Sequence, residues 1–256
     1  MFEILGVAIR QTTALSSASQ LRQKNRRMKP ETTAGHVIVT GASSGIGAAI
    51  AMRLLREGWR VTGLSRSDPG LADARYTHRA VDLLDAAALP GAVAGISPTA
   101  FVHAAGLMRG GVVGALDAEA GRTLWRLHVE AASHLADLLV PRMADGGRIV
   151  LIGSRTAAGA AGRSQYAASK AALVAMVRSW AIELAPRGIT ANVVAPAATD
   201  TPMLRDPARS AVAPKLPPIG RYVRPEEVAA FTAFLLGPDA GAITGQQMLI
   251  CGGSSL

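Results

Sequence analysis

The chain has 256 residues, enough to bury one sizeable core, and α/β proteins of this length are commonly a single domain. Hydrophobic residues make up 49% of the sequence and charged residues 18%, a balance that excludes an intrinsically disordered chain and a repeat array. The net charge of +9 is uneven: residues 1–27 hold five basic residues and one acidic residue, and the remaining +5 is too small for a dedicated polyanion-binding surface.

The first 33 residues are expected to be a basic N-terminal extension, either disordered or upstream of a true start at Met28. The cluster from Arg22 to Arg27 has the composition of a nucleic-acid, membrane or organelle-targeting arm. Because the organised pattern begins only after Met28, we expect no nucleic-acid partner, and we place one domain at residues 34–256.

From His36 onward, short apolar runs alternate with helical patterns. Runs that are rich in Val and Ile and bounded by Gly, Pro or Ser are typical of buried parallel strands. Strands are predicted at residues 36–40, 60–64, 76–81, 99–103, 148–152, 190–194 and 247–251, and helices at residues 46–57, 85–94, 117–143, 165–186 and 225–236. This alternation predicts an α/β single-domain Rossmann fold, a doubly wound seven-stranded parallel sheet with helices on both faces. The proline-rich stretch 203–224 interrupts it and is predicted to be a substrate lid.

A glycine-rich turn, Thr40-Gly-Ala-Ser-Ser-Gly-Ile-Gly47, follows the first predicted strand and opens an alanine-rich helix. A dinucleotide pyrophosphate binds backbone N–H groups at such a helix start, where a Cβ would hold it away. Gly41 would allow the tight turn, Gly45 the approach of the phosphate, and Gly47 the packing of the helix on the sheet. The segment predicts a dinucleotide site.

The spacing Gly-x-x-x-Gly-x-Gly resembles that of the short-chain dehydrogenase/reductase (SDR) superfamily, in its 3-oxoacyl-reductase-like branch, and the resemblance extends from about Val37 to Gly253. It implies cofactor contacts from Gly41, Ser43, Ser44, Gly45, Ile46, Gly47, Ser65, Arg66, Asp82, Leu83, His103, Ala104, Ala105, Gly106, Tyr166, Lys170, Pro196, Ala197, Thr199 and Thr201. Two of these cofactor positions depart from the family pattern. His103 replaces an Asn that braces the sheet, and Ala197 replaces a Gly.

The end of the second strand bears on the choice of cofactor. A site that prefers NAD has a carboxylate there, which holds the adenosine ribose and repels a 2′-phosphate. This sequence has Ser65 at that place, followed by Arg66, whose guanidinium can pair with a phosphate. We therefore predict NADP(H) rather than NAD(H).

Three residues are predicted to carry the chemistry. A carbonyl oxygen that gains negative charge during reduction needs a proton, and Tyr166 is the expected donor. Lys170 follows four residues later on the same helix face. Its ammonium, together with the positive nicotinamide of the oxidised cofactor, is expected to lower the tyrosine pKa from its usual value of about 10. Ser154, at the end of a strand, would polarise the substrate oxygen.

The fourth catalytic position of the resembled family is an Asn, and it falls on His128 here. His128 could relay protons itself, since an unperturbed imidazole has a pKa near 6.5. It could equally be a spacer that leaves the relay slower, and the sequence leaves both alternatives open. No group of residues has metal-ligand spacing, so we expect no metal.

The substrate pocket is predicted to lie between residues 107–109, residues 155–163 and the lid. Arg155, Arg163 and Arg205 would suit an acidic or acyl-carrier-bound substrate, unless they are scattered surface arginines. The single cysteine, Cys251, cannot form an internal disulfide and favours a reducing compartment, so we expect a cytoplasmic protein with no membrane partner.

The function predicted from these features is an NADP(H)-dependent interconversion of a ketone or aldehyde with an alcohol. The alternative is a catalytically impaired regulatory or scaffold protein that binds NADP(H), and the substitutions at His103, His128 and Ala197 motivate it. The resemblance also implies a homo-oligomer, a tetramer or a dimer.

Overall fold

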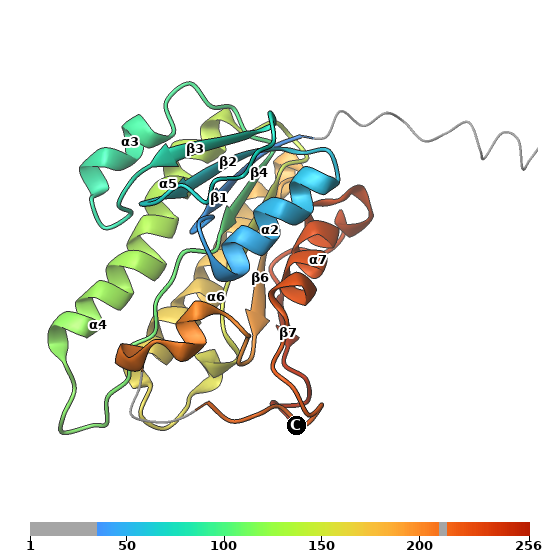
Figure 1. Ribbon diagram of the computed structural model, residues 1–256. Coiled ribbons are helices and arrows are strands. Elements are labelled where there is room, and N and C mark those ends of the chain that lie inside the picture. The colour runs from blue at the N-terminus through green and yellow to red at the C-terminus, as the bar shows by residue number, and fades with distance from the viewer. Residues whose placement is uncertain (1–34, 210–213) are drawn as a thin grey trace, which may run out of the picture. The chain divides into compact units, whose positions relative to one another are not determined.

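The computed structural model describes residues 35–209 and 214–256, so the predicted N-terminal extension lies outside the described residues. Seven parallel strands form one sheet in the order β3-β2-β1-β4-β5-β6-β7 (Figure 1). The strands are β1 (His36–Thr40), β2 (Arg60–Ser65), β3 (Tyr76–Ala80), β4 (Ala100–His103), β5 (Arg148–Ile152), β6 (Thr190–Pro196) and β7 (Gln247–Ile250). The strand order reverses between β1 and β4, and a crevice opens at the carboxyl ends of strands at such a point. The predicted doubly wound fold is confirmed.

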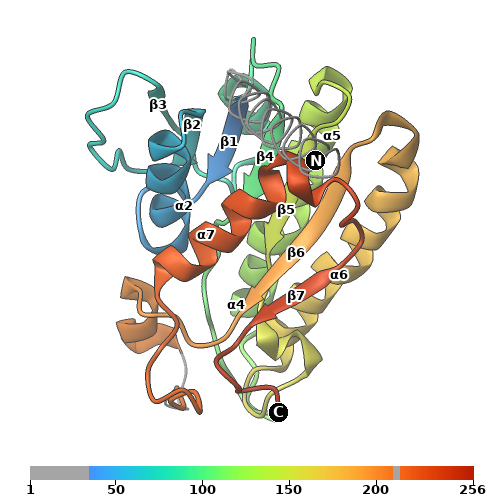
Figure 2. The same cartoon turned by 90° about the vertical axis from the view of Figure 1, so that its right-hand side faces the viewer.

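Helices cover both faces of the sheet (Figure 2). They are α2 (Gly45–Arg56), α3 (Leu89–Ala92), α4 (Ala118–Trp125), α5 (Ala131–Leu139), α6 (Ser164–Leu184) and α7 (Pro225–Leu236). Successive side chains of a strand point to opposite faces, so Val37 and Val39 pack with α2 and α7, while Ile38 packs with α5 and α6. The two resulting cores hold the sheet rigid beneath the site.

The longest predicted helix, at residues 117–143, is broken. It forms α4, a π-helical turn at Arg126–Glu130, α5 and a final 3₁₀ turn. A π turn inserts one extra residue into the helix and is frequent at functional sites. Its periodicity differs little from that of an α-helix, and the sequence pattern therefore does not reveal it. The predicted helix at residues 85–94 shortens to a 3₁₀ turn and α3, whose second and third residues are Pro90 and Gly91.

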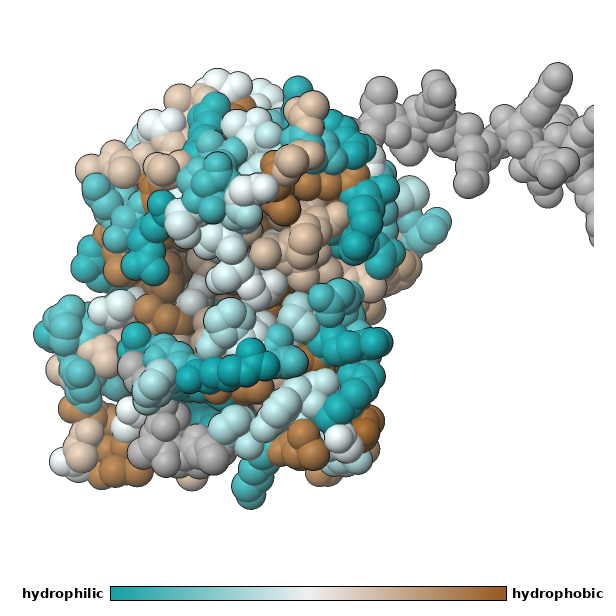
Figure 3. All heavy atoms as spheres, in the orientation of Figure 1, coloured by the Kyte–Doolittle hydropathy of each residue, from teal (hydrophilic) through white to brown (hydrophobic). Residues whose placement is uncertain are grey.

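The face drawn in Figure 3 intersperses hydrophilic and hydrophobic side chains. No helix within residues 35–209 and 214–256 is long and apolar enough to cross a bilayer.

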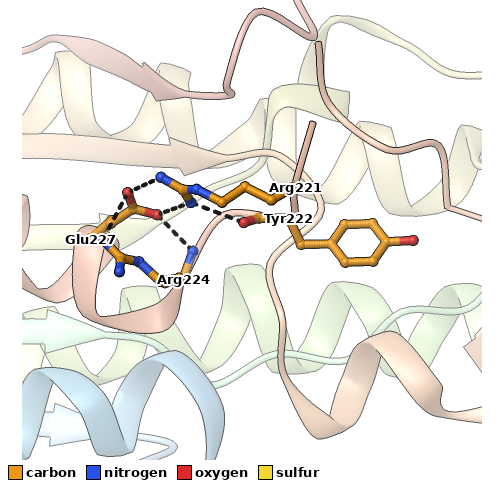
Figure 4. A network of polar contacts seen from close by, with 4 residues as sticks. All are labelled: Arg221, Tyr222, Arg224 and Glu227. Atoms are coloured by element: carbon orange, nitrogen blue, oxygen red, sulfur yellow. Dashed lines mark hydrogen bonds and ion pairs between the residues drawn. The ribbon is translucent and has the colours of Figure 1, made fainter. Parts of the chain in front are cut away.

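Ion pairs anchor the carboxyl end of the predicted lid to α7. Glu227 accepts hydrogen bonds from the guanidinium of Arg221 at 2.7 Å and 2.8 Å and from the backbone N–H of Arg224 at 2.8 Å (Figure 4). These bonds, the one to Arg221 above all, lower the pKa of the Glu227 carboxyl to about 2. The ring of Tyr222 points away from Glu227 (Figure 4). Two 3₁₀ turns, Pro202–Arg205 and Pro207–Arg209, lead into the lid and form its first residues.

Candidate active site

A cleft of about 810 Å³ lies at the carboxyl ends of the strands. Its lining includes the glycine-rich turn after β1, the end of β2, the loop after β4, the start of α6 and the first lid residues. Nineteen of the twenty predicted cofactor residues line it, together with Ser154 and His128, and His103 is the exception. One cavity therefore brings the predicted cofactor and catalytic residues together.

The glycine-rich turn has the close packing expected of a phosphate cradle. Gly41 and Gly45 have positive φ angles of 67° and 55°, a region where other residues are strained. A Cβ on Gly41 would lie 2.8 Å from the Cα of Ala105, and one on Gly47 would lie 2.2 Å from the carbonyl oxygen of Gly41. The bare backbone before α2 thus fits a dinucleotide pyrophosphate, whose phosphates need this closeness.

His103 lies behind this turn, not in the cleft. The hydroxyl of Thr40 accepts hydrogen bonds from the N–H groups of Ala104 and Ala105, at 3.0 Å and 3.1 Å, so its own proton points to His103 Nδ1, 3.0 Å away. His103 Nε2 then donates to the carbonyl of Leu127 at 3.1 Å. Burial is the main cause that lowers the pKa of this imidazole to about 3. The predicted cofactor contact of His103 is wrong: the side chain is completely buried and links β1 and β4 to the π turn.

At the end of β2, Ser65 and Arg66 line the cleft as predicted. The Ser65 hydroxyl donates to the carbonyl of Ser67 at 2.9 Å, and the ring of His78 on β3 donates to the carbonyl of Ser65 at 3.1 Å. The nearby Asp68 is exposed and accepts from the N–H of Gly70. No carboxylate therefore occupies the place of Ser65.

Ser154, Tyr166 and Lys170 are all buried at the other end of the cleft. Ser154 precedes a 3₁₀ turn, where its hydroxyl accepts from the N–H of Thr156 at 3.2 Å and bonds the Thr156 hydroxyl at 2.8 Å. Lys170 lies one helical turn after Tyr166, with its Nζ 6.0 Å from the centre of the tyrosine ring, and donates to the carbonyl of Ile152 at 2.8 Å. Hydrogen bonds within the protein thus hold the side chains of Ser154 and Lys170 near the buried Tyr166.

Burial is the largest cause of the pKa shifts of Tyr166 and Lys170. It lowers the pKa of Lys170 to about 7 and raises that of Tyr166. A hydrogen bond to Ser154 and the charges of Arg209 and Arg163 oppose the rise at Tyr166. The protein residues alone therefore raise the tyrosine pKa, and the lowering expected from Lys170 together with an oxidised nicotinamide stays a prediction. The desolvation of the phenolate dominates, and a lysine with a pKa of about 7 is only partly charged at neutral pH.

His128 lies in the π turn, with both ring nitrogens in hydrogen bonds. Its Nε2 accepts from the N–H of Leu107 at 3.2 Å, so the ring proton lies on Nδ1 and points to the hydroxyl of Ser169, 2.9 Å away. Ser169 in turn donates to the carbonyl of Tyr166 at 2.9 Å. Burial, followed by the charge of Lys170, lowers the pKa of His128 well below its usual value. The imidazole is therefore neutral and joins α6 to the loop after β4.

The loop after β6 closes the middle of the cleft. The N–H of Ala197 donates to the carbonyl of Ile250 at 3.0 Å, which ties this loop to β7. The Thr199 hydroxyl donates to the carbonyl of Ala197 at 2.9 Å, and the Thr201 hydroxyl to that of Thr199 at 3.3 Å. A Cβ on Gly45 would touch Thr201 at 3.3 Å, so this loop and the glycine-rich turn face each other across a narrow space.

The predicted pocket walls are only partly correct. Arg155 and Arg163 line the cleft, whereas Arg109 pairs with Asp206 at 3.2 Å and Arg205 pairs with Asp200 at 2.5 Å. Sequence reasoning missed Thr156, Ser169 and Arg209. Thr156 and Ser169 are ordinary short polar residues by sequence, and only their partners single them out. The residues that the structure describes contain no cluster of side chains suited to a metal.

Known proteins resemble this chain over most of its length. A family model described as Enoyl-(Acyl carrier protein) reductase matches residues 41–255. The Cyclic-di-GMP-binding biofilm dispersal mediator protein of Escherichia coli is 34% identical over 230 residues, covering 84% of this chain and 95% of that protein. The 3-oxoacyl-[acyl-carrier-protein] reductase FabG of Vibrio cholerae is 32% identical over 234 residues, with the same coverage.

Solved structures of similar proteins superpose on this chain over most of its length. A short-chain dehydrogenase/reductase from Serratia marcescens superposes with a TM-score of 0.77 at 34% identity, covering 86% of this chain and 98% of that one. A blue fluorescent protein from a metagenomic library, solved in complex with NADPH, gives a TM-score of 0.78 at 32% identity with the same coverage.

Proposed function

The chain belongs to the short-chain dehydrogenase/reductase superfamily and has 3-oxoacyl-reductase-like relatives, and from this we propose that it is an NADP(H)-dependent oxidoreductase that interconverts a ketone or aldehyde with an alcohol. The observation that carries the proposal is the shared cleft. The glycine-rich turn and Arg66 line one end of it, and Ser154, Tyr166 and Lys170 are buried at the other.

The nicotinamide, when bound, supplies or accepts the hydride. In the direction of reduction, Tyr166 donates its phenolic proton to the substrate oxygen, and the hydroxyl of Ser154 hydrogen-bonds the same oxygen. The raised pKa of Tyr166 keeps the phenol protonated near neutral pH, which suits a proton donor. Lys170 has a pKa of about 7, so near neutral pH its ammonium can give a proton back to the phenolate. An exposed lysine, with its higher pKa, would keep its proton at this pH.

His128 acts in this proposal as a positioning residue. A proton relay must gain and lose a proton, but protonation of Nε2 would break the bond from Leu107. The imidazole instead holds Ser169, and through it the first turn of α6 that carries Tyr166. Of the two alternatives left open by the sequence, this geometry supports the spacer.

The cofactor preference rests on the end of β2. Arg66 follows Ser65 there, and the only acidic side chain among the described lining residues is that of Asp82, which follows β3. The NADPH-bound structural relative is consistent with this choice. The test is Arg66→Asp with Arg60→Asp as its control, because Arg60 is an exposed arginine at the opposite end of the same strand. Arg66→Asp should weaken NADPH binding at least about tenfold and favour NADH, since it replaces a charge-assisted pair by repulsion. Unchanged NADPH affinity would remove Arg66 from the site.

The oxidoreductase activity is tested with a panel of ketones and aldehydes, with NADPH and NADH each followed by loss of reduced cofactor. Faster turnover with NADPH is the expected result. Tight NADPH binding without turnover of any compound would favour the alternative, a regulatory or scaffold protein. The geometry argues against that alternative, since His103 and His128 are both fully hydrogen-bonded and leave Tyr166 and Lys170 in place.

We further propose that residues 34–256 form the functional unit, that residues 203–224 act as its lid, and that the protein works in the cytoplasm as a homo-oligomer. Large apolar side chains that a second copy would cover are exposed on four elements: Trp125 on α4, Ile182 on α6, Phe234 on α7 and Leu249 on β7. Light scattering coupled to size exclusion should give the mass of a tetramer or a dimer. A monomer at micromolar concentration would contradict this proposal.

A further inference from the structure

The charges around the cleft are strongly one-sided. Among the described residues, six basic side chains line it against one acidic side chain, that of Asp82: Arg66, Arg155, Arg163, Lys170, Arg209 and Lys215. Arg66 and Lys170 have roles in the proposed function, which leaves four other basic side chains in the lining. The segment 210–213, outside the described residues, reads Ser-Ala-Val-Ala and contributes no carboxylate.

Arg163 and Arg209 are the two of these four whose charges act on the catalytic tyrosine. Arg163 immediately precedes α6, so it lies within one turn of Tyr166, and the bond from the N–H of Gly111 to the carbonyl of Gly162 fixes the chain there. Arg209 ends the second 3₁₀ turn of the lid. Both arginines are half-buried, and both lower the pKa of Tyr166, while Arg163 also lowers that of Arg209. Arg163 and Arg209 therefore line the same cleft as the phenol, and their charges act on it and on each other.

Other arginines of the lid differ in this respect. Arg205 pairs with Asp200, and Arg221 pairs with Glu227 outside the cleft (Figure 4). Among the described residues, Arg209 forms no ion pair with a carboxylate, and its bond to the carbonyl of Leu204 is 3.5 Å long. Two like charges in one half-buried cleft repel each other, and an anionic ligand that binds to both would offset this cost.

On the basis of the function proposed above, we propose that the carbonyl substrate also carries a carboxylate, which Arg163 and Arg209 bind while the carbonyl group lies against Ser154 and Tyr166. A guanidinium matches a carboxylate with two parallel hydrogen bonds, and such bonds are stronger than neutral ones. The bound carboxylate would also neutralise the two charges that lower the tyrosine pKa. The phenol would then stay protonated until it donates its proton to the substrate oxygen.

The experiment compares straight-chain oxo acids, which differ in the spacing between carbonyl and carboxylate, with their methyl esters. The measured quantity is the ratio of kcat/KM for each acid to that for its ester. In the wild type this ratio should be on the order of 10 to 100 for the best acid, and Arg163→Gln or Arg209→Gln should each reduce it at least about tenfold. Arg163→Lys and Arg209→Lys, which keep the charge, should recover part of it.

Arg205→Gln is the matched control, because this arginine belongs to the same lid but is paired outside the cleft. Its ratio should equal that of the wild type. If the esters are reduced as well as the acids, or if Arg205→Gln changes the ratio as much as Arg209→Gln, the carboxylate site is wrong and the oxidoreductase proposal stands.

Binding without turnover provides a second readout. Calorimetry should detect hexanoate, but not hexanamide, binding to the wild type saturated with NADP⁺. This difference should vanish when Arg163 and Arg209 are both changed to Gln. Equal binding of the two compounds would overturn the carboxylate site even if no ketone is reduced, an outcome that would separately overturn the proposed function.

Discussion

The glycine-rich end of the cleft presents mainly backbone to its ligand, whereas the catalytic end presents buried side chains. At the first end, Gly41 and Gly45 bring the chain close to where phosphates would lie, and their contacts leave no room for a Cβ at Gly41. At the second end, Tyr166 and Lys170 are buried, with their pKa values shifted by desolvation. The first end is adapted to binding and costs little stability. The second is adapted to proton transfer, and a buried ammonium destabilises the fold.

The largest effect that separates the two ends is expected from Lys170→Met. Turnover should fall about 10²- to 10⁴-fold, the usual contribution of acid/base groups, while NADPH is still bound. The free energy of unfolding should rise at pH 6, because the cost of burying the ammonium exceeds the about 1 kcal/mol lost with the hydrogen bond to Ile152. Each kcal/mol should raise the Tm by about 2–4 °C.

The pH dependence of stability gives the control for this variant. The unfolded lysine holds its proton up to its usual pKa of 10.5, but the folded one only up to about 7. The burial penalty is therefore complete below pH 7, and wild-type stability should rise between pH 7 and 10. Lys170→Met should remove this rise in stability, whereas the control Lys215→Met, at an exposed position, should keep it. A lower Tm at pH 6 and an unchanged slope would contradict the destabilising role of Lys170.

A smaller effect on function, confined to cofactor binding, is expected from substitutions at the glycine-rich end of the cleft. Gly45→Ala and Gly95→Ala both place a side chain at a positive φ, 55° and 70°, at a cost of about 1–2 kcal/mol each. Only Gly45 lines the cleft, while Gly95 faces open space. Both variants should lose similar stability, but only Gly45→Ala should weaken NADPH binding, at least about tenfold, in a fluorescence titration. Equal affinities in the two variants would show that the turn does not hold the cofactor.

The smallest effect is expected from His128→Asn. The amide can accept the bond from Leu107, so turnover should fall less than about tenfold. His128→Leu should cost more, because it leaves the N–H of Leu107 and the hydroxyl of Ser169 without this partner. Because His128 is neutral, the pH profile of kcat between pH 5 and 8 should be the same in the wild type and in His128→Asn. A wild-type step near pH 6.5 that disappears in His128→Asn, but not in a His134→Asn control, would indicate a proton relay instead.

The two ends also differed in how far the sequence predicted them. The glycine-rich end is formed by one continuous segment. The glycine spacing from Thr40 to Gly47 was therefore enough to predict both the turn and the helix that follows it. The sheet was predictable for the same reason, since each buried strand is a short apolar run between turn residues.

The catalytic end depends on contacts between distant segments. Tyr166 and Lys170 were predictable because they share one helix face. The partners of His128 lie 21 and 41 residues away, and the position of its ring comes from a π turn that has no clear sequence signal. The same reason explains the error at His103, whose burial behind the glycine-rich turn results from bonds to Thr40 and Leu127.

The most direct test measures NADPH binding and ketone reduction in the same samples of wild type, Tyr166→Phe and Tyr76→Phe. Tyr76 is the control because its buried hydroxyl forms no hydrogen bond with any described residue. We expect Tyr166→Phe to bind NADPH within about threefold of the wild type and to reduce the ketone at least about 10²-fold more slowly, with Tyr76→Phe unchanged in both. A Tyr166→Phe enzyme that keeps a tenth or more of wild-type turnover would contradict Tyr166 as the proton donor.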